Sequence, residues 1–155
     1  MESVLNNIKL KFDNDGFIVN ENLINQSDLE AIEKWISELN DSKEVNHHYE
    51  KTVNGKVLSR TENFVSSHTS FREFLLSSSI KDYLTMLFDD EPILFKEKIN
   101  YKYPGGAGYA PHQDAPAYPF GKKHITMLLA IDDSDINNGC LEFARGRNNE
   151  GIINI

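Results

Sequence analysis

Apolar residues recur at helical spacing soon after residue 27. An apolar residue at every third or fourth position turns one side of a helix toward the protein interior, so we predict an amphipathic helix over 28–39. Ser27 fits the N-cap, and Glu30, three residues later, completes a capping box. The apolar positions that carry this pattern are Leu29, Ile32, Trp35, Ile36 and Leu39.

Two further helices are predicted before the proline at position 92. Three apolar residues at helical spacing indicate a short helix over about 69–76. A second helix begins near Ser78 or Ser79 and ends in the acidic run before Pro92, because a residue that precedes proline avoids the helical conformation. The apolar positions of this second helix are Ile80, Tyr83, Leu84, Leu87 and Phe88.

Shorter apolar runs between turn residues predict strands. Residues 17–19 follow a turn and predict a short strand, and Asn54-Gly55 between two alternating runs predicts a hairpin. Residues 40–48 are polar and predict a loop, in which His47 and His48 are expected to face solvent. Strand-like runs dominate the second half of the chain, over 93–103, 124–132 and 139–144.

The order of these elements predicts the fold class. Helices followed by strands are typical of an α+β domain, in which a helical layer packs on a mostly antiparallel sheet. We expect the helical layer over about 1–91 and the strands over about 92–155. A length of 155 residues fits a single domain.

Composition excludes several classes of partner. The 24 acidic residues exceed the 16 basic ones and give a formal charge of −8, which argues against binding to nucleic acid or to anionic membranes. No apolar run approaches the roughly 20 residues that cross a bilayer, and the N-terminus does not resemble a signal peptide. The single cysteine, Cys140, fits a reducing cytoplasm.

One triplet carries candidate chemistry. His112 and Asp114 are one position apart and follow a glycine-rich run, and on an extended chain alternate side chains point to the same side. A histidine, a carboxylate and a second histidine form the facial triad that holds Fe(II) in non-haem oxygenases and leaves three positions open. The triplet alone is weak, because a His-Asp pair on a strand is usually a surface hydrogen bond.

Five blocks of the sequence resemble one known family. They read FKEKINYKYPGG over 95–106, HQD over 112–114, NNGCLEFARG over 137–146, DGFIV over 15–19 and RTENF over 60–64. Together they are similar to the phytanoyl-CoA dioxygenase family, which comprises Fe(II)- and 2-oxoglutarate-dependent hydroxylases of small molecules. The resemblance implies a double-stranded β-helix, a jelly-roll or cupin-like barrel, with the N-terminal helices packed on it.

The resemblance also assigns roles to residues. His112 and Asp114 match two metal ligands, and Asn100, Tyr109 and Gln113 match positions that border the 2-oxoglutarate pocket. The family's second metal histidine and its 2-oxoglutarate-binding arginine match no position up to residue 155, so we expect an incomplete barrel. Relatives that halogenate have a small residue in place of Asp114, and this aspartate therefore favours hydroxylation.

Strand alternation suggests which residues could meet the substrate. Lys98 shares a face with Asn100 and could contact an anionic substrate, as could Lys96, although both are more typical of a solvated strand face. Thr126 is a candidate for the barrel interior. We expect His124 to start a strand rather than to act as the third ligand.

Two classes of function remain open. The chain is expected to be a cytoplasmic Fe(II)/2-oxoglutarate dioxygenase of a small metabolite, or else a truncated, catalytically inactive barrel that acts as a binding module. Unpaired strand edges would allow self-association in either case. A cupin-like isomerase is a weaker alternative, because the HQD and NNGCLE blocks argue against it.

Overall fold

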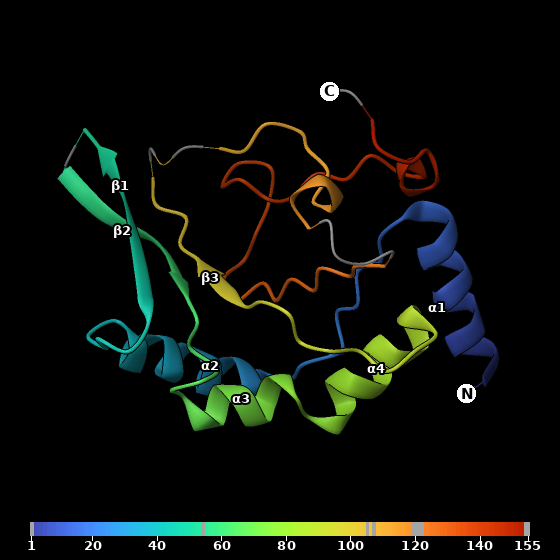
Figure 1. Ribbon diagram of the computed structural model, residues 1–155, viewed down its shortest axis with the longest axis horizontal. Coiled ribbons are helices and arrows are strands. Elements are labelled where there is room, and N and C mark those ends of the chain that lie inside the picture. Colours follow the sequence, from blue (N-terminus) through green and yellow to red (C-terminus); the bar gives the residue numbers. More distant parts are fainter. Residues whose placement is uncertain (1, 54, 105, 107, 119–122, 154–155) are drawn as a thin grey trace.

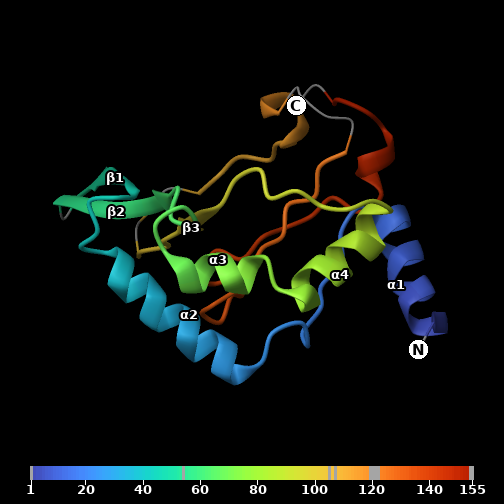
Figure 2. The same ribbon diagram turned by 60° about the horizontal axis from the view of Figure 1, so that its bottom comes forward.

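Helices supply the N-terminal part of the fold. The computed structural model describes residues 2–53, 55–104, 106, 108–118 and 123–153. Helix α2 (Gln26–Leu39) packs beside α3 (Thr69–Leu75), and α1 (Glu2–Asp15) packs beside α4 (Ser78–Phe88) (Figures 1 and 2). The three predicted helices are confirmed to within about two residues. None of the described helices has the length and apolar character of a bilayer span.

The N-cap of α2 differs from the prediction. Helix α2 begins after Asn25, whose side chain accepts a hydrogen bond from the backbone N–H of Asp28 at 3.0 Å. The Asp28 carboxylate in turn accepts from the backbone N–H of Asn25 at 3.0 Å, which completes a capping box two residues earlier than expected. Ser27 lies inside the first turn instead. Asparagine caps a helix as well as serine does, so composition could not decide between them.

Helix α1 was not predicted, and the expected strand over 17–19 is wrong. The helix ends at Asp15, and Gly16 follows with φ +80°, in the left-handed region that favours glycine. The backbone N–H of Gly16 donates to the carbonyl of Phe12 at 2.8 Å. Residues 17–20 then run without a strand partner in the described part of the chain.

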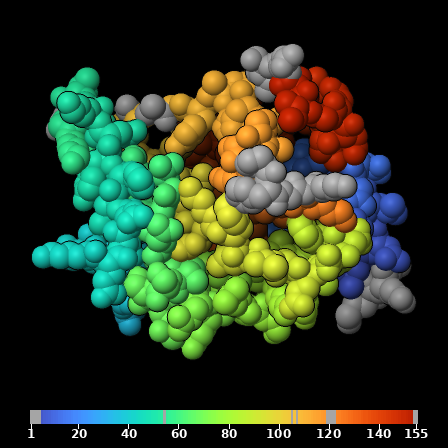
Figure 3. Space-filling model, viewed as in Figure 1, coloured from blue at the N-terminus to red at the C-terminus, as the bar shows by residue number. Residues whose placement is uncertain are grey.

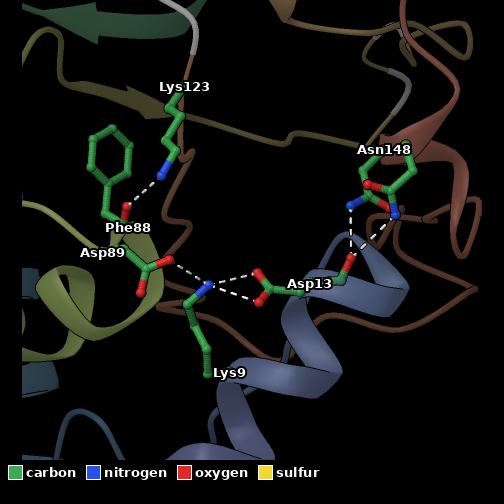
Figure 4. A network of polar contacts seen from close by, with 7 residues as sticks. Lys9, Asp13, Phe88, Asp89, Lys123 and Asn148 are labelled. Atoms are coloured by element: carbon green, nitrogen blue, oxygen red, sulfur yellow. Dashed lines mark hydrogen bonds and ion pairs between the residues drawn. The ribbon is translucent and has the colours of Figure 1, made fainter.

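Replacing Gly16 tests how closely the C-terminal segment packs on α1. A Cβ at Gly16 would lie 2.7 Å from Oδ1 of Asn148, whose Nδ2 donates to the carbonyl of Asp13 at 3.1 Å (Figure 4). Gly16→Ala is expected to lower the free energy of unfolding by about 1–3 kcal/mol, because it adds backbone strain to this clash. Urea unfolding measures the change. Gly108→Ala is the control, since no atom lies within 4 Å of its added Cβ; an equal loss in both variants would contradict the packing.

Helices α1 and α4 are also joined by an ion-pair network (Figure 4). Lys9 Nζ lies 2.8 Å from Asp13 Oδ1 and 3.0 Å from Asp89 Oδ2. These hydrogen bonds raise the pKa of Lys9 above its ordinary value. Asp89 follows the last residue of α4 and has a left-handed backbone, so this helix ends at Phe88, four residues before Pro92.

Three antiparallel strands form the described sheet, in the order β1-β2-β3. The hairpin of β1 (Asn46–Thr52) and β2 (Gly55–Glu62) confirms the prediction, although Asn54 lies outside the described residues. Strand β3 (Lys98–Asn100) pairs with the end of β2. The expected loop over 40–48 is wrong for its last three residues, because β1 begins at residue 46.

The core lies between this sheet and helices α2 and α3. One aromatic group holds it together: the ring of Phe71 lies 4.7 Å from that of Phe64 and 5.2 Å from that of Trp35. Aromatic pairs at such distances add to the free energy gained by burying their area. The buried members of the core are Ile32, Leu39, Val45, Phe64 and Phe71, against which Ile99, Leu129 and Ile131 also pack.

The strands expected in the second half are largely absent from the described residues. Of 93–103 only β3 is paired, and neither 124–132 nor 139–144 is part of a ladder. A strand needs hydrogen bonds from a neighbouring strand, and none lies beside these segments in the described part of the chain. Burial nevertheless alternates along 124–132, as expected for an extended segment with one face on the core. The helices and antiparallel sheet confirm the α+β class without a closed barrel.

Candidate metal centre

The structure brings His112 and Asp114 together. Nε2 of His112 lies 3.6 Å from Oδ1 of Asp114, and both side chains are about half exposed, at 59% and 49%. Nδ1 of His112 lies 2.8 Å from the carbonyl oxygen of Ala110. A carbonyl can only accept, so Nδ1 carries the proton in this contact and the lone pair of Nε2 points outward. This is the support that metal-binding histidines commonly have.

Asp114 is oriented by a second segment. The hydroxyl of Thr126 donates to Oδ2 of Asp114 at 3.1 Å. This bond leaves Oδ1, the oxygen nearer to His112, available to an ion. Thr126, a candidate substrate contact in the sequence, therefore lies beside the carboxylate.

Gln113 makes contacts that its sequence did not indicate. Its Nε2 donates to the carbonyl of Gly151 at 2.9 Å, and its Oε1 accepts from the backbone N–H of Ile153 at 2.8 Å. Both ends of the amide are thus engaged by one short segment, residues 151–153. Gln113 anchors that segment against the His-x-Asp triplet, whereas the resemblance implied a contact with the co-substrate.

Asn100 and Tyr109 line the same hollow. The Nζ atom of Lys102, another of its residues, lies 5.5 Å from the centre of the Tyr109 ring. A Cβ at Gly106 would lie 3.0 Å from Oε1 of Glu50, so glycine allows the chain to approach here. Figure 3 shows the segments 93–104 and 108–118, yellow to orange, at the surface of one face. The residues that line the hollow are Glu50, Ser59, Asn100, Tyr101, Lys102, Tyr103, Gly106 and Tyr109.

A buried carboxylate on the same sheet gathers three basic side chains. Oε1 of Glu62 lies 3.1 Å from Arg60 Nε and 3.1 Å from Lys96 Nζ, and Oε2 lies 3.3 Å from His48 Nε2. The contacts at Oε1 are ionic rather than well-aligned hydrogen bonds. Burial acts to raise the pKa of Glu62, but Lys96 and the charges of Arg60 and His48 outweigh it and hold the pKa below its ordinary value. The sequence alone did not indicate this cluster around Glu62, because its members come together only when β1, β2 and β3 pair.

The opposite face of the sheet holds a chain of hydrogen bonds. His47, expected in solvent, donates from Nε2 to the carbonyl of Ser42 at 3.2 Å. Its Nδ1 therefore accepts from the hydroxyl of the fully buried Thr61 at 3.0 Å, and the Tyr101 hydroxyl lies 3.2 Å from that of Thr61. Burial raises the pKa of Tyr101 above its ordinary value. The prediction that His47 faces solvent is therefore wrong, because both of its ring nitrogens form hydrogen bonds inside the fold.

The donor set fits an Fe(II) ion in part. Imidazole nitrogen and carboxylate oxygen suit Fe(II), and the outward lone pair of His112 and the open Oδ1 of Asp114 face the same space. No third histidine, cysteine or carboxylate completes a metal-binding group within the described ranges. The ring of His124, the alternative ligand in the sequence, lies 5.9 Å from that of Tyr118.

Comparison with known proteins gives a consistent assignment. The model of the family described as phytanoyl-CoA dioxygenase matches residues 12–152. The chain is 36% identical over 149 residues to a methylphosphonate hydroxylase of Gimesia maris, a match that covers 94% of this chain and 57% of that protein. It is 38% identical over 153 residues to a 2-aminoethylphosphonate dioxygenase of an uncultured bacterium, with 94% and 58% covered.

A more distant relative is a dioxygenase of Epichloe uncinata, 33% identical over 131 residues, with 81% of this chain and 51% of that protein covered. The chain thus spans between half and three fifths of the length of these relatives. No solved structure matches it.

Proposed function

Because this chain belongs to the phytanoyl-CoA dioxygenase family, we propose that it carries the metal-binding segment of an Fe(II)- and 2-oxoglutarate-dependent dioxygenase that hydroxylates a small molecule. The observation that carries this proposal is the pair of His112 and Asp114, whose open donor atoms lie 3.6 Å apart. Their orientation supports the same role, because the Ala110 carbonyl and the Thr126 hydroxyl each hold one of the two side chains.

Each residue of the centre has a proposed task. His112 and Asp114 would hold the metal, and Asn100 and Tyr109 would border the 2-oxoglutarate site from the hollow that they share. Gln113 would keep the triplet in place through its two bonds to the 151–153 segment. The chemistry that Fe(II) supplies when bound is activation of O2, with the oxidation of 2-oxoglutarate to succinate and CO2 providing two electrons.

We propose a small phosphonate as the substrate class. The relatives named above as a methylphosphonate hydroxylase and a 2-aminoethylphosphonate dioxygenase support this choice. The overall charge of −8 does not oppose it, because a small anion needs only a local group of cations.

The remaining expectations accompany this proposal. The alternating burial of residues 124–132 supports a double-stranded β-helix fold for this part of the chain. We propose a single domain, with a helical part over about 1–91 and barrel strands over about 92–155. A cytoplasmic location, expected from the single cysteine, and self-association through strand edges stay predictions.

Turnover assays test the proposal. The folded chain, supplied with Fe(II), 2-oxoglutarate and O2, is expected to release succinate faster when methylphosphonate or 2-aminoethylphosphonate is added, with formation of a hydroxylated product. Omission of O2 or of Fe(II) should stop the reaction. A folded sample that releases no succinate under any of these conditions would contradict the proposal and favour a binding module.

A further inference from the structure

The sheet has one face on the helical core and one open face. In the segment that contains β3, Ile99 packs on the core, while the neighbouring Lys98 and Asn100 are exposed on the opposite side. Strand pairing continues this open face onto β2, since Lys98 is opposite Glu62 and Asn100 is opposite Arg60. We call the basic side chains of this open face, Arg60, Lys96 and Lys98, the cationic face.

Positive charge exceeds negative charge on this face. Glu62 contacts both Arg60 and Lys96 at 3.1 Å, so one carboxylate faces two permanent cations. Lys98 adds a third cation and forms no ion pair with the described residues. Glu50, in the neighbouring hollow, lowers the surplus without cancelling it. Such a surplus, in a protein whose net charge is −8, indicates a place for an anion.

The metal centre lies on the same side of the sheet layer. Leu129 and Ile131 pack on the same core as Ile99, so by alternation Thr126 points away from the helices. The hydroxyl of Thr126 holds Asp114, which places this carboxylate on the open side. Asn100 connects the two groups, because it is paired with Arg60 in the ladder and lines a hollow with Tyr109.

We propose that the cationic face binds the phosphonate group of the substrate, with Arg60 and Lys98 as the contacting residues, on the side of the sheet that also holds Asp114. This inference rests on the proposed function. A phosphonate presents three oxygens and up to two negative charges, which match a planar guanidinium together with a nearby ammonium. Arg60 remains 34% exposed, and its buried Nε has no well-aligned acceptor among the described residues.

Glu62 would act as a positioning residue for this face. Its carboxylate is only 11% exposed and holds Arg60 and Lys96 from below, so that both cations stay at the sheet rather than extend into solvent. A buried acceptor that fixes two long side chains in advance reduces the conformational entropy lost when a ligand binds.

A metal-free binding experiment tests the inference. Methylphosphonate is titrated into the chain while backbone amide signals are followed by NMR, for wild type, Lys98→Gln, Arg60→Gln and the control Lys43→Gln. We expect each of the first two changes to weaken binding about 10-fold or more, since charge-assisted hydrogen bonds are lost, and the control to change it less than about 2-fold. Methylsulfonate, with one negative charge, should bind more weakly than methylphosphonate.

Two outcomes would overturn the inference. Equal affinity for methylphosphonate in all four proteins would exclude the cationic face. A loss of 2-oxoglutarate binding in Lys98→Gln without a loss of methylphosphonate binding would assign this face to the co-substrate. Because the titration needs no metal, its result is independent of turnover. If succinate release depended on phosphonate but Lys98→Gln and Arg60→Gln bound methylphosphonate as tightly as wild type, the proposed function would stand and only this site would be rejected.

Discussion

His112→Ala is expected to weaken Fe(II) binding more than about 100-fold, because even the loss of a hydrogen bond that orients a metal ligand costs about 10–100-fold. Succinate release should fall with it to the level of the metal-free protein. The physical reason is local: Nε2 of His112 is the only nitrogen donor beside Asp114 in the described part of the chain, and alanine offers no lone pair in its place. An anaerobic calorimetric titration with Fe(II) measures the affinity of each protein for the metal.

The matched control for this variant is His124→Ala. His124 lies beside Tyr118 rather than beside Asp114. Because distant sites affect each other only weakly, its replacement should leave the affinity for Fe(II) within about 3-fold of wild type. Both variants should keep the wild-type circular dichroism spectrum, since both side chains lie outside the core. Metal binding that survives in His112→Ala but disappears in His124→Ala would reverse the assignment.

Phe71→Ala is expected to produce the largest loss of stability, about 3–5 kcal/mol. Phe71 is only 4% exposed, and its ring contacts the rings of Phe64 and Trp35 at the centre of the core. Removing it leaves a cavity beneath the sheet in addition to the lost burial of the ring. Urea unfolding, followed by the fluorescence of Trp35, measures the effect where the cavity forms.

The control for the core variant is Phe95→Ala. Phe95 is 61% exposed, against 4% for Phe71, so its replacement exposes far less buried apolar area and the expected loss is below about 1.5 kcal/mol. If Phe71→Ala lost no more stability than Phe95→Ala, the sheet could not rest on the core described above.

Elements that depend on nearby residues were predictable from the sequence. Helix α2 has its apolar stripe and its cap within the same turns, and strands β1 and β2, which pair with each other, lie next to each other in the chain. Helix α1 had neither a recognised apolar stripe nor a recognised cap in the sequence. Contacts of Lys9 and Asp13 with residues more than 70 positions away stabilise it. The strands after residue 100 needed partners that local pattern cannot supply.

The candidate site divides in the same way. His112 and Asp114 share one short segment, so their closeness in the sequence was sufficient to expect them together. The strand alternation assumed for them is absent, because Asp114 has a helical backbone at the start of the 3-10 turn over 115–117. The group around Glu62 depends on the register between β2 and β3, which sets Lys98 opposite Glu62. The bonds of Gln113 to Gly151 and Ile153 cross about 40 residues and have no signal in either segment.

Paramagnetic broadening by Mn²⁺ is the most direct test of a metal centre at His112 and Asp114. Mn²⁺ takes the same oxygen and nitrogen ligands as Fe(II), and it broadens the NMR signals of nuclei close to it. The amide signals of His112, Asp114 and Thr126 are expected to disappear first as Mn²⁺ is added to the labelled protein. Broadening that begins instead at the acidic turn 132–135, with the signals of these three residues still sharp, would contradict a metal centre at His112 and Asp114.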